Sequence, residues 1–118
     1  MRLNIPTGSR VLTGAPARPF QRTVIEGIAR VVAETPGIVE AHLPLCLVEG
    51  VMASPAIILV VAVDVLSAAA FVADDLQARI RKLLAAGEHM DIWPLVTSDP
   101  VLQAIRGANC RIFPRELI

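Results

Sequence analysis

The sequence contains no tyrosine, and its four aromatic residues, three Phe and one Trp, make up only 3% of 118 positions. A core with so few rings must be aliphatic, and hydrophobic residues of all kinds reach 54%. Surplus aliphatic surface on a small domain tends to mark a partner surface. We therefore expect a homo-oligomer, in the simplest case a dimer, with a different protein partner as the alternative.

An excess of either charge is also absent. The chain has 11 basic and 11 acidic residues, and all but one of the basic residues are arginine. Nucleic-acid-binding domains usually show a basic footprint, so we expect no nucleic-acid partner. The length fits a single domain, which we place at residues 1–118.

Cysteine is scarce. Cys46 and Cys110 both lie in apolar surroundings and form neither a CxxC motif nor a disulfide framework, so we expect free thiols in buried positions. The N-terminal stretch MRLNIPTGSRVL has no uninterrupted apolar segment such as a secretory signal requires. These absences predict a cytoplasmic protein.

The most apolar stretch, residues 56–73, is broken only by Asp64 and Ser67. In a transmembrane helix Asp64 would sit near the bilayer centre, at a cost of about 2.5 to 3.5 kcal/mol. No belt of Trp or Tyr flanks the stretch, and AIILVVAV at 56–63 is rich in β-branched residues. The pattern predicts a buried strand that ends in a turn at Asp64, and it predicts no membrane span.

Hydrophobic periodicity predicts eight elements in the order β-α-β-β-α-β-α-β. We expect Pro19 in the first helical turn, Pro44 and Pro94 at a sheet edge or irregularity, and Ser98 or Asp99 as a helix cap. The expected fold is a two-layer α+β sandwich, with helices on one face of a mostly antiparallel sheet and a split βαβ-like core. Its strands are placed at about 9–16, 37–50, 56–64, 89–96 and 110–117, and its helices at about 19–34, 71–86 and 97–109.

The segment GIVEAHLPLCLVEG at 37–50 alternates as a half-buried strand does. His42 falls on the face opposite the leucines, where a solvated or locally bonded histidine is expected. The apolar face comprises Val39, Ala41, Leu43, Leu45 and Leu47.

Residues that carry chemistry are few. The sequence has no GxGxxG, GxxxxGK[ST] or GxSxG motif. His42 and His89 are its only histidines, and they belong to no spaced set of three metal ligands. We therefore expect no metal and no cofactor, and enzymatic activity ranks behind binding because no catalytic constellation is visible.

The turn TGAP at 13–16 stands between a predicted strand and a predicted helix. A helix N-terminus can bind an anion, and arginines lie nearby, although plain turn chemistry also explains the motif. The candidate ligand-binding residues are Thr13, Gly14, Arg18 and Arg22. Trp93, the sole tryptophan, is a candidate interface anchor, with a core or rim position as the alternative.

The segment VLTGAPARPFQRTVIEGIARVVAETPGIVEAHLPLC resembles the opening of the C-terminal domain of SseB, the enhanced serine sensitivity protein. The shared pattern is a strand that ends in a Gly-x-Pro turn, here Gly14 and Pro16, then a helix and AHL at 41–43. An apolar strand at 57–63, a helix and MDIWPL before a short capped helix continue it, over roughly residues 10–114. This chain departs from the family's closing pattern, a Pro followed by aromatics including Tyr, because Phe113 precedes Pro114 and Tyr is absent.

The resemblance implies a non-catalytic module and supplies no catalytic residues to carry over. The family module usually follows an N-terminal domain, so we expect a stand-alone relative. The leading hypothesis is a protein-interaction or self-association module. The alternative is a regulatory domain that binds a small molecule, such as an amino acid or an anion, near the TGAP turn.

Overall fold

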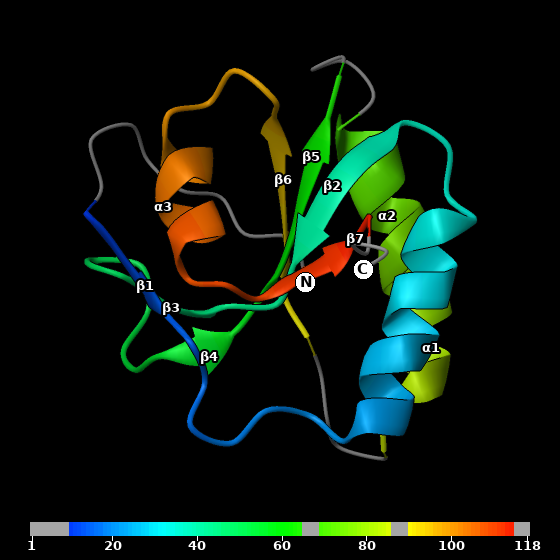
Figure 1. Cartoon of the computed structure of the whole chain (residues 1–118), viewed down its shortest axis with the longest axis horizontal. Coiled ribbons are helices and arrows are strands. Elements are labelled where there is room, and N and C mark those ends of the chain that lie inside the picture. The colour runs from blue at the N-terminus through cyan, green and yellow to red at the C-terminus, as the bar shows by residue number, and fades with distance from the viewer. Residues whose placement is uncertain (1–9, 65–68, 86–89, 115–118) are drawn as a thin grey trace.

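The computed structural model describes residues 10–64, 69–85 and 90–114, and the fold within them is α+β (Figure 1). The predicted class is therefore confirmed. The helices are α1 (Arg22–Ala33), α2 (Ala69–Ile80) and α3 (Val101–Gly107), and a short 3-10 helix, η2 (Arg81–Leu83), follows α2. The strands are β1 (Val11–Gly14), β2 (Ile38–His42), β3 (Leu45–Val48), β4 (Ala56–Ile57), β5 (Leu59–Val63), β6 (Ile92–Val96) and β7 (Arg111–Phe113).

The strands form two sheets, with the order β6-β5-β2-β7 in one and β1-β3-β4 in the other. The predicted antiparallel pairing is confirmed for β2 with β5, and the β5–β6 pair runs parallel. Pro94 lies in β6, which is an edge strand of the four-stranded sheet and pairs only with β5. This position agrees with the prediction, because proline has no N–H to donate to a second neighbouring strand.

Two predicted strands each divide between the two sheets. The segment 37–50 becomes β2 and β3, and the segment 56–64 becomes β4 and β5. The breaks lie side by side, because the Ile58 N–H donates to the Pro44 carbonyl at 3.1 Å. Pro44 has no N–H to give to a ladder, so it suits this bend. The paired bend carries one continuous pair of strands from the four-stranded sheet into the three-stranded sheet.

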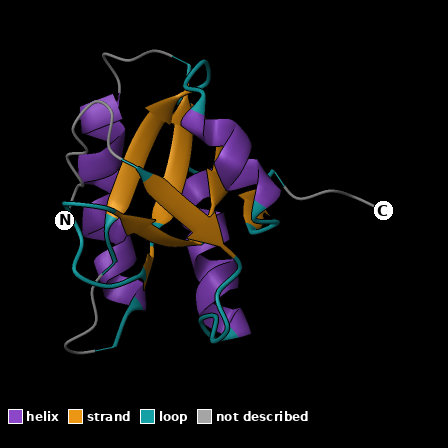
Figure 2. Cartoon of the chain, turned by 90° about the vertical axis from the view of Figure 1, so that its left-hand side faces the viewer, coloured by secondary structure: helices purple, strands orange, loops and turns teal. Residues whose placement is uncertain are grey.

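Both faces of the four-stranded sheet are covered. All five residues of β5 are buried, so each face of this strand needs a layer packed on it. Helices α1 and α2 cover one face, and α3 packs on the other together with β1 and β3 (Figures 1 and 2). The position of α3 differs from the expectation that all helices share one face, because the apolar residues of β5 alternate between two cores. The first core includes Ile28, Val32, Leu59, Val61, Val63 and Leu76, and the second includes Cys46, Val60, Ala62, Trp93, Leu102 and Ile105.

The helix boundaries refine the predicted ranges. Helix α1 begins at Arg22, so Pro19 precedes the helix instead of lying in its first turn. It is followed by a turn that includes Gly37, whose φ of 92° is a conformation that favours glycine. Helix α3 begins at Val101 with Pro100 at the N-cap, one residue after the two predicted cap candidates, Ser98 and Asp99. The Asp99 carboxylate still accepts a hydrogen bond from the Val101 N–H at 3.0 Å.

A bulge corrects the predicted apolar face of β2. The register with β5 shifts between Ile38 and Glu40. Ile38 is therefore buried in the first core, while Val39, which simple alternation places among the leucines, is 40% exposed. Alternation holds from Glu40 onward, where Glu40 lies opposite Ala62 on the α3 side of the sheet.

The apolar stretch at 56–73 supplies β4, β5 and the start of α2. The strand prediction is confirmed for its first half, and Asp64 is exposed directly after β5. Ser67 lies outside the described residues, as does His89. Within the described ranges, no helix combines the length and the apolar character that crossing a membrane requires.

Candidate functional site

The three-stranded sheet is apolar on both of its faces. Its inner face looks toward α3, because Val11 and Cys46 belong to the second core and the Thr13 hydroxyl donates to the Ala104 carbonyl at 3.2 Å. Side chains alternate along a strand, so the residues between these point the other way. We call this second side the outer face, and it consists of Leu12, Gly14, Leu45, Leu47 and Ile57.

The described residues leave the outer face partly uncovered. Leu12 is 42% exposed, and Leu45 and Leu47 are half-buried. Ile57 is also half-buried, and it packs against the edge of the first core. A β-carbon added at Gly14 would meet no atom within 4 Å, so there is open space beside this residue. Antiparallel sheets with a solvated side normally place polar residues on it. A solvated side made of leucines and isoleucine is therefore the strongest candidate for a binding surface in the described structure.

One pair of opposite charges lies at the end of the outer face. The register of β1 with β3 pairs Val11 with Val48, and it continues to Arg10 and Glu49, because the Glu49 N–H donates to the Arg10 carbonyl at 3.0 Å. The Arg10 and Glu49 side chains form an exposed ion pair at 4.0 Å. By alternation these side chains share a face with Leu12 and Leu47.

A second feature is a charge cluster between β2 and α3, in which Glu40 and His42 are buried and the Arg106 side chain is 41% exposed. Arg106 of α3 donates two hydrogen bonds, both 2.8 Å long, to the two carboxylate oxygens of Glu40. His42 Nε2 lies 2.5 Å from Glu40 Oε2, and because an ionised carboxylate only accepts hydrogen bonds, Nε2 carries the proton. The hydrogen bonds from Arg106 are the main reason that the pKa of Glu40 is lowered from 4.5 to about 2, and the bond from His42 adds to them.

The geometry of this cluster indicates a structural role, in which it links α3 to β2. His42 is buried and bonded to Glu40, so it is locally bonded, as one of the predicted alternatives has it, and it is not solvated. Its Nδ1 has no hydrogen-bond partner within the described part of the chain. No nucleophilic hydroxyl or thiol in that part is therefore placed for activation by this imidazole. The cluster holds α3 against β2, which positions the inner face of the three-stranded sheet.

The two cysteines are free, and neither has the character of a nucleophile. Cys46 is buried, and this burial is the main reason that its pKa is raised to about 11. Cys110 is only partly buried, and desolvation raises the pKa of its thiol as well. Both groups therefore stay protonated at neutral pH, whereas reactive cysteines need a lowered pKa.

The predicted ligand-binding residues do not converge on one site. Thr13 is bonded to α3, and Gly14 lies on the outer face of the three-stranded sheet. Arg22 forms an exposed ion pair with Glu26 at 3.1 Å, one helical turn along α1, and Arg18 is exposed in the connection. In Figure 1 that connection crosses from β1 on one side of the molecule to α1 on the other.

Trp93 lies in the second core and is only 7% exposed. This position matches the core alternative given for it. The alternation predicted for 37–50 places Leu43, Leu45 and Leu47 on one apolar face of a half-buried strand, so it does not reveal the outer face. Leu43 is buried in the first core, and the other two lie beyond the bend, where they are only half-buried.

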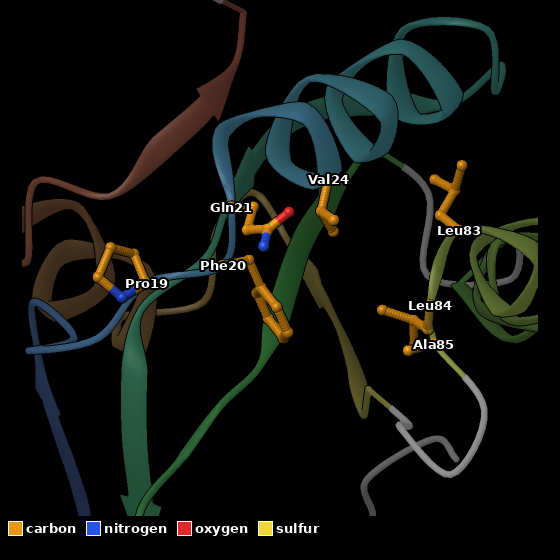
Figure 3. A pocket seen from close by; sticks show the side chains of 7 residues that line it. All are labelled: Pro19, Phe20, Gln21, Val24, Leu83, Leu84 and Ala85. Carbon is orange, nitrogen blue, oxygen red and sulfur yellow. The ribbon is translucent and has the colours of Figure 1, made fainter.

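A groove of about 530 Å³ separates the start of α1 from η2 (Figure 3). Gln21 supplies the one polar side chain among the described residues that line it, and none of those residues is charged. An amino acid or an inorganic anion needs charged or multiple polar partners, so this lining suits an apolar molecule. The described lining consists of Pro19, Phe20, Gln21, Val24, Leu83, Leu84 and Ala85.

Metal-ligand geometry is absent from the described residues, where no group of three or more His, Cys, Asp or Glu side chains could hold an ion. Comparison with family models, with curated proteins and with solved structures gives no match to this chain. The resemblance to the SseB C-terminal domain stays a prediction.

Proposed function

We propose that this chain is a non-catalytic module that acts by associating with an aliphatic protein surface, of which a second copy of the chain is the simplest example. The observation that carries the proposal is the outer face of the three-stranded sheet, which the described residues leave partly uncovered, with Leu12 at 42% exposure. We also place the chain in the cytoplasm, as a relative of the SseB C-terminal domain, on the sequence arguments alone.

The physical reason is the cost of leaving this face in water. Removing apolar surface from water is favourable by roughly 25 cal/mol per Å², and a solvated sheet face can avoid the cost simply by carrying polar residues. Here strands β1, β3 and β4 carry leucine, isoleucine and glycine at the outward positions. A partner that covers these side chains recovers that free energy, so association is what the face is suited to do.

Substitution of Leu12 by Lys tests this role. We expect self-association, measured by sedimentation velocity from micromolar to millimolar concentration, to weaken by about tenfold or more, because burial of a leucine contributes roughly 1.5 to 3 kcal/mol. The unfolding free energy of the monomer should change by only about 0.5 kcal/mol, since Leu12 is half-exposed.

Phe71→Lys is the matched control for this experiment. Phe71 is 76% exposed on α2, away from the three-stranded sheet, so its replacement removes a larger apolar group from a different surface. Self-association should be unchanged in this variant. Equal loss in both variants would indicate non-specific stickiness, and a wild-type chain that stays monomeric throughout the concentration range would contradict self-association.

The groove between α1 and η2 supports a second candidate function, binding of a small apolar molecule. Its volume of about 530 Å³ falls within the range of roughly 300 to 1,000 Å³ that is usual for ligand sites. In a thermal-shift screen, uncharged aliphatic or aromatic compounds should raise the melting midpoint by several degrees, while free amino acids and anions should not. Val24→Gln should remove the shift, because Val24 lines the groove. A shift that persists in this variant would place the ligand elsewhere.

A further inference from the structure

We infer that the outer face binds a second copy of this chain, related to the first by a two-fold axis that lies parallel to the strands between β1 and β3. This inference rests on the proposed function and adds to it the identity and the orientation of the partner. It is carried by the charges, the shapes and the register of the residues that this face presents.

Charge complementarity favours a second copy. Besides its apolar residues, the outer face has Arg10, directly before β1, and Glu49, directly after β3, paired with each other at the same end of the two strands. A two-fold axis between the two strands places β1 of each copy opposite β3 of the other. Arg10 of one copy then faces Glu49 of the other, and the reverse contact forms at the same time. A face with one cation and one anion on adjacent strands is therefore complementary to itself.

The apolar residues match under the same operation. The register pairs Leu12 with Leu47 and Gly14 with Leu45 on neighbouring strands of one copy. After the rotation, Leu12 of one copy faces Leu47 of the other. Leu45 faces Gly14 of the other copy, where a side chain has open space to enter because a β-carbon added at Gly14 meets nothing within 4 Å. Each leucine of β1 and β3 on this face thus meets either a leucine or an opening.

The size of the sheet sets the strength of the contact. Strands β1 and β3 have four residues each and β4 has two. Neighbouring strands are about 4.8 Å apart and rise about 3.4 Å per residue, so the face falls well below the roughly 800 Å² per partner of a standard interface. We therefore expect a weak, reversible dimer that is detected at high protein concentration.

Charge reversal at the end of the face tests the arrangement. Arg10→Glu alone and Glu49→Arg alone should each weaken dimerisation by about tenfold or more, because each variant creates two like-charge contacts across the axis. An equimolar mixture of the two variants should regain the wild-type affinity, since a mixed pair restores both opposite-charge contacts. The double variant Arg10→Glu with Glu49→Arg should also regain it. Sedimentation velocity at low salt measures all four samples.

A steric test accompanies the charge test. Gly14→Arg should weaken dimerisation by about tenfold or more, because it fills the opening that receives Leu45 of the second copy. Gly107→Arg is the matched control, since a β-carbon at Gly107 also meets nothing within 4 Å but lies at the end of α3. Both variants should keep the wild-type circular dichroism spectrum, which shows that the monomer still folds.

The outcomes separate this inference from the proposed function. Restored affinity in the mixture supports the two-fold arrangement. If the wild-type chain dimerises and Leu12→Lys weakens it, but the mixture stays as weak as its components, the orientation inferred here is wrong while self-association through this face stands. A wild-type chain that is monomeric at every concentration overturns both.

Discussion

Glu40→Gln is expected to lower the free energy of unfolding at pH 7 by about 3 kcal/mol. The Glu40 carboxylate is buried between β2 and α3, and it accepts two hydrogen bonds from Arg106 and one from His42. These bonds favour the ionised form, so the pKa of Glu40 falls from 4.5 to about 2. A shift of one unit corresponds to about 1.4 kcal/mol, which gives the expected loss when the charge is removed. Urea unfolding of the two proteins at pH 7 measures it.

The same shift predicts how the difference depends on pH. A carboxyl group whose pKa is lowered by folding stabilises the native state above its unfolded pKa, here 4.5, and the stabilisation disappears as the pH falls toward about 2. The wild-type protein should therefore lose stability across this window, whereas Glu40→Gln should lose less. The two unfolding free energies should approach each other near pH 2, where Glu40 is substantially protonated.

Glu26→Gln is the matched control for this measurement. Glu26 pairs with Arg22 on the surface of α1, where the Arg22 side chain is 91% exposed. Exposed pairs of this kind contribute about 0.2 to 1 kcal/mol, so this variant should unfold almost as the wild type does at pH 7. A loss of similar size in both variants would show that the Glu40–His42–Arg106 cluster has no special role in holding α3.

Leu76→Ala is expected to lower the free energy of unfolding by about 2 to 5 kcal/mol. Leu76 lies on α2 and is fully buried in the first core, between the two helices and the four-stranded sheet. Truncation removes the free energy of its transfer from water and leaves a cavity that the packed neighbours fill only in part. Urea or thermal unfolding of the two proteins gives the difference.

Phe71→Ala on the same helix is the control. Phe71 lies five positions before Leu76 and is 76% exposed, so its truncation should change the unfolding free energy by about 0.5 kcal/mol or less. If Phe71→Ala were as costly as Leu76→Ala, the face of α2 assigned to the core would be wrong. The pair therefore tests the orientation of α2 on the four-stranded sheet.

The buried strand was predictable because AIILVVAV leaves no polar position for solvent on either side, and the structure buries every residue of β5. The start of α3 was predictable to within a residue or two for a similarly local reason, since the Asp99 carboxylate accepts a hydrogen bond from an N–H two residues away. The outer face of the three-stranded sheet could not be predicted in this way. Leu43 and Leu45 have the same alternation in the sequence, and only the bend at Pro44 and Ile58 separates a covered leucine from a half-exposed one.

By itself, the sequence determined the α+β class, the antiparallel pairing of β2 with β5 and an aliphatic core, because these follow from local periodicity, turn chemistry and composition. Only the tertiary structure decided which apolar faces lie beneath helices, and it brought Arg106 onto Glu40 across 66 positions of sequence. The reason is physical. The alternating pattern indicates which apolar residues share one side of a strand. Whether that side is covered depends on where distant helices pack once the strands have bent.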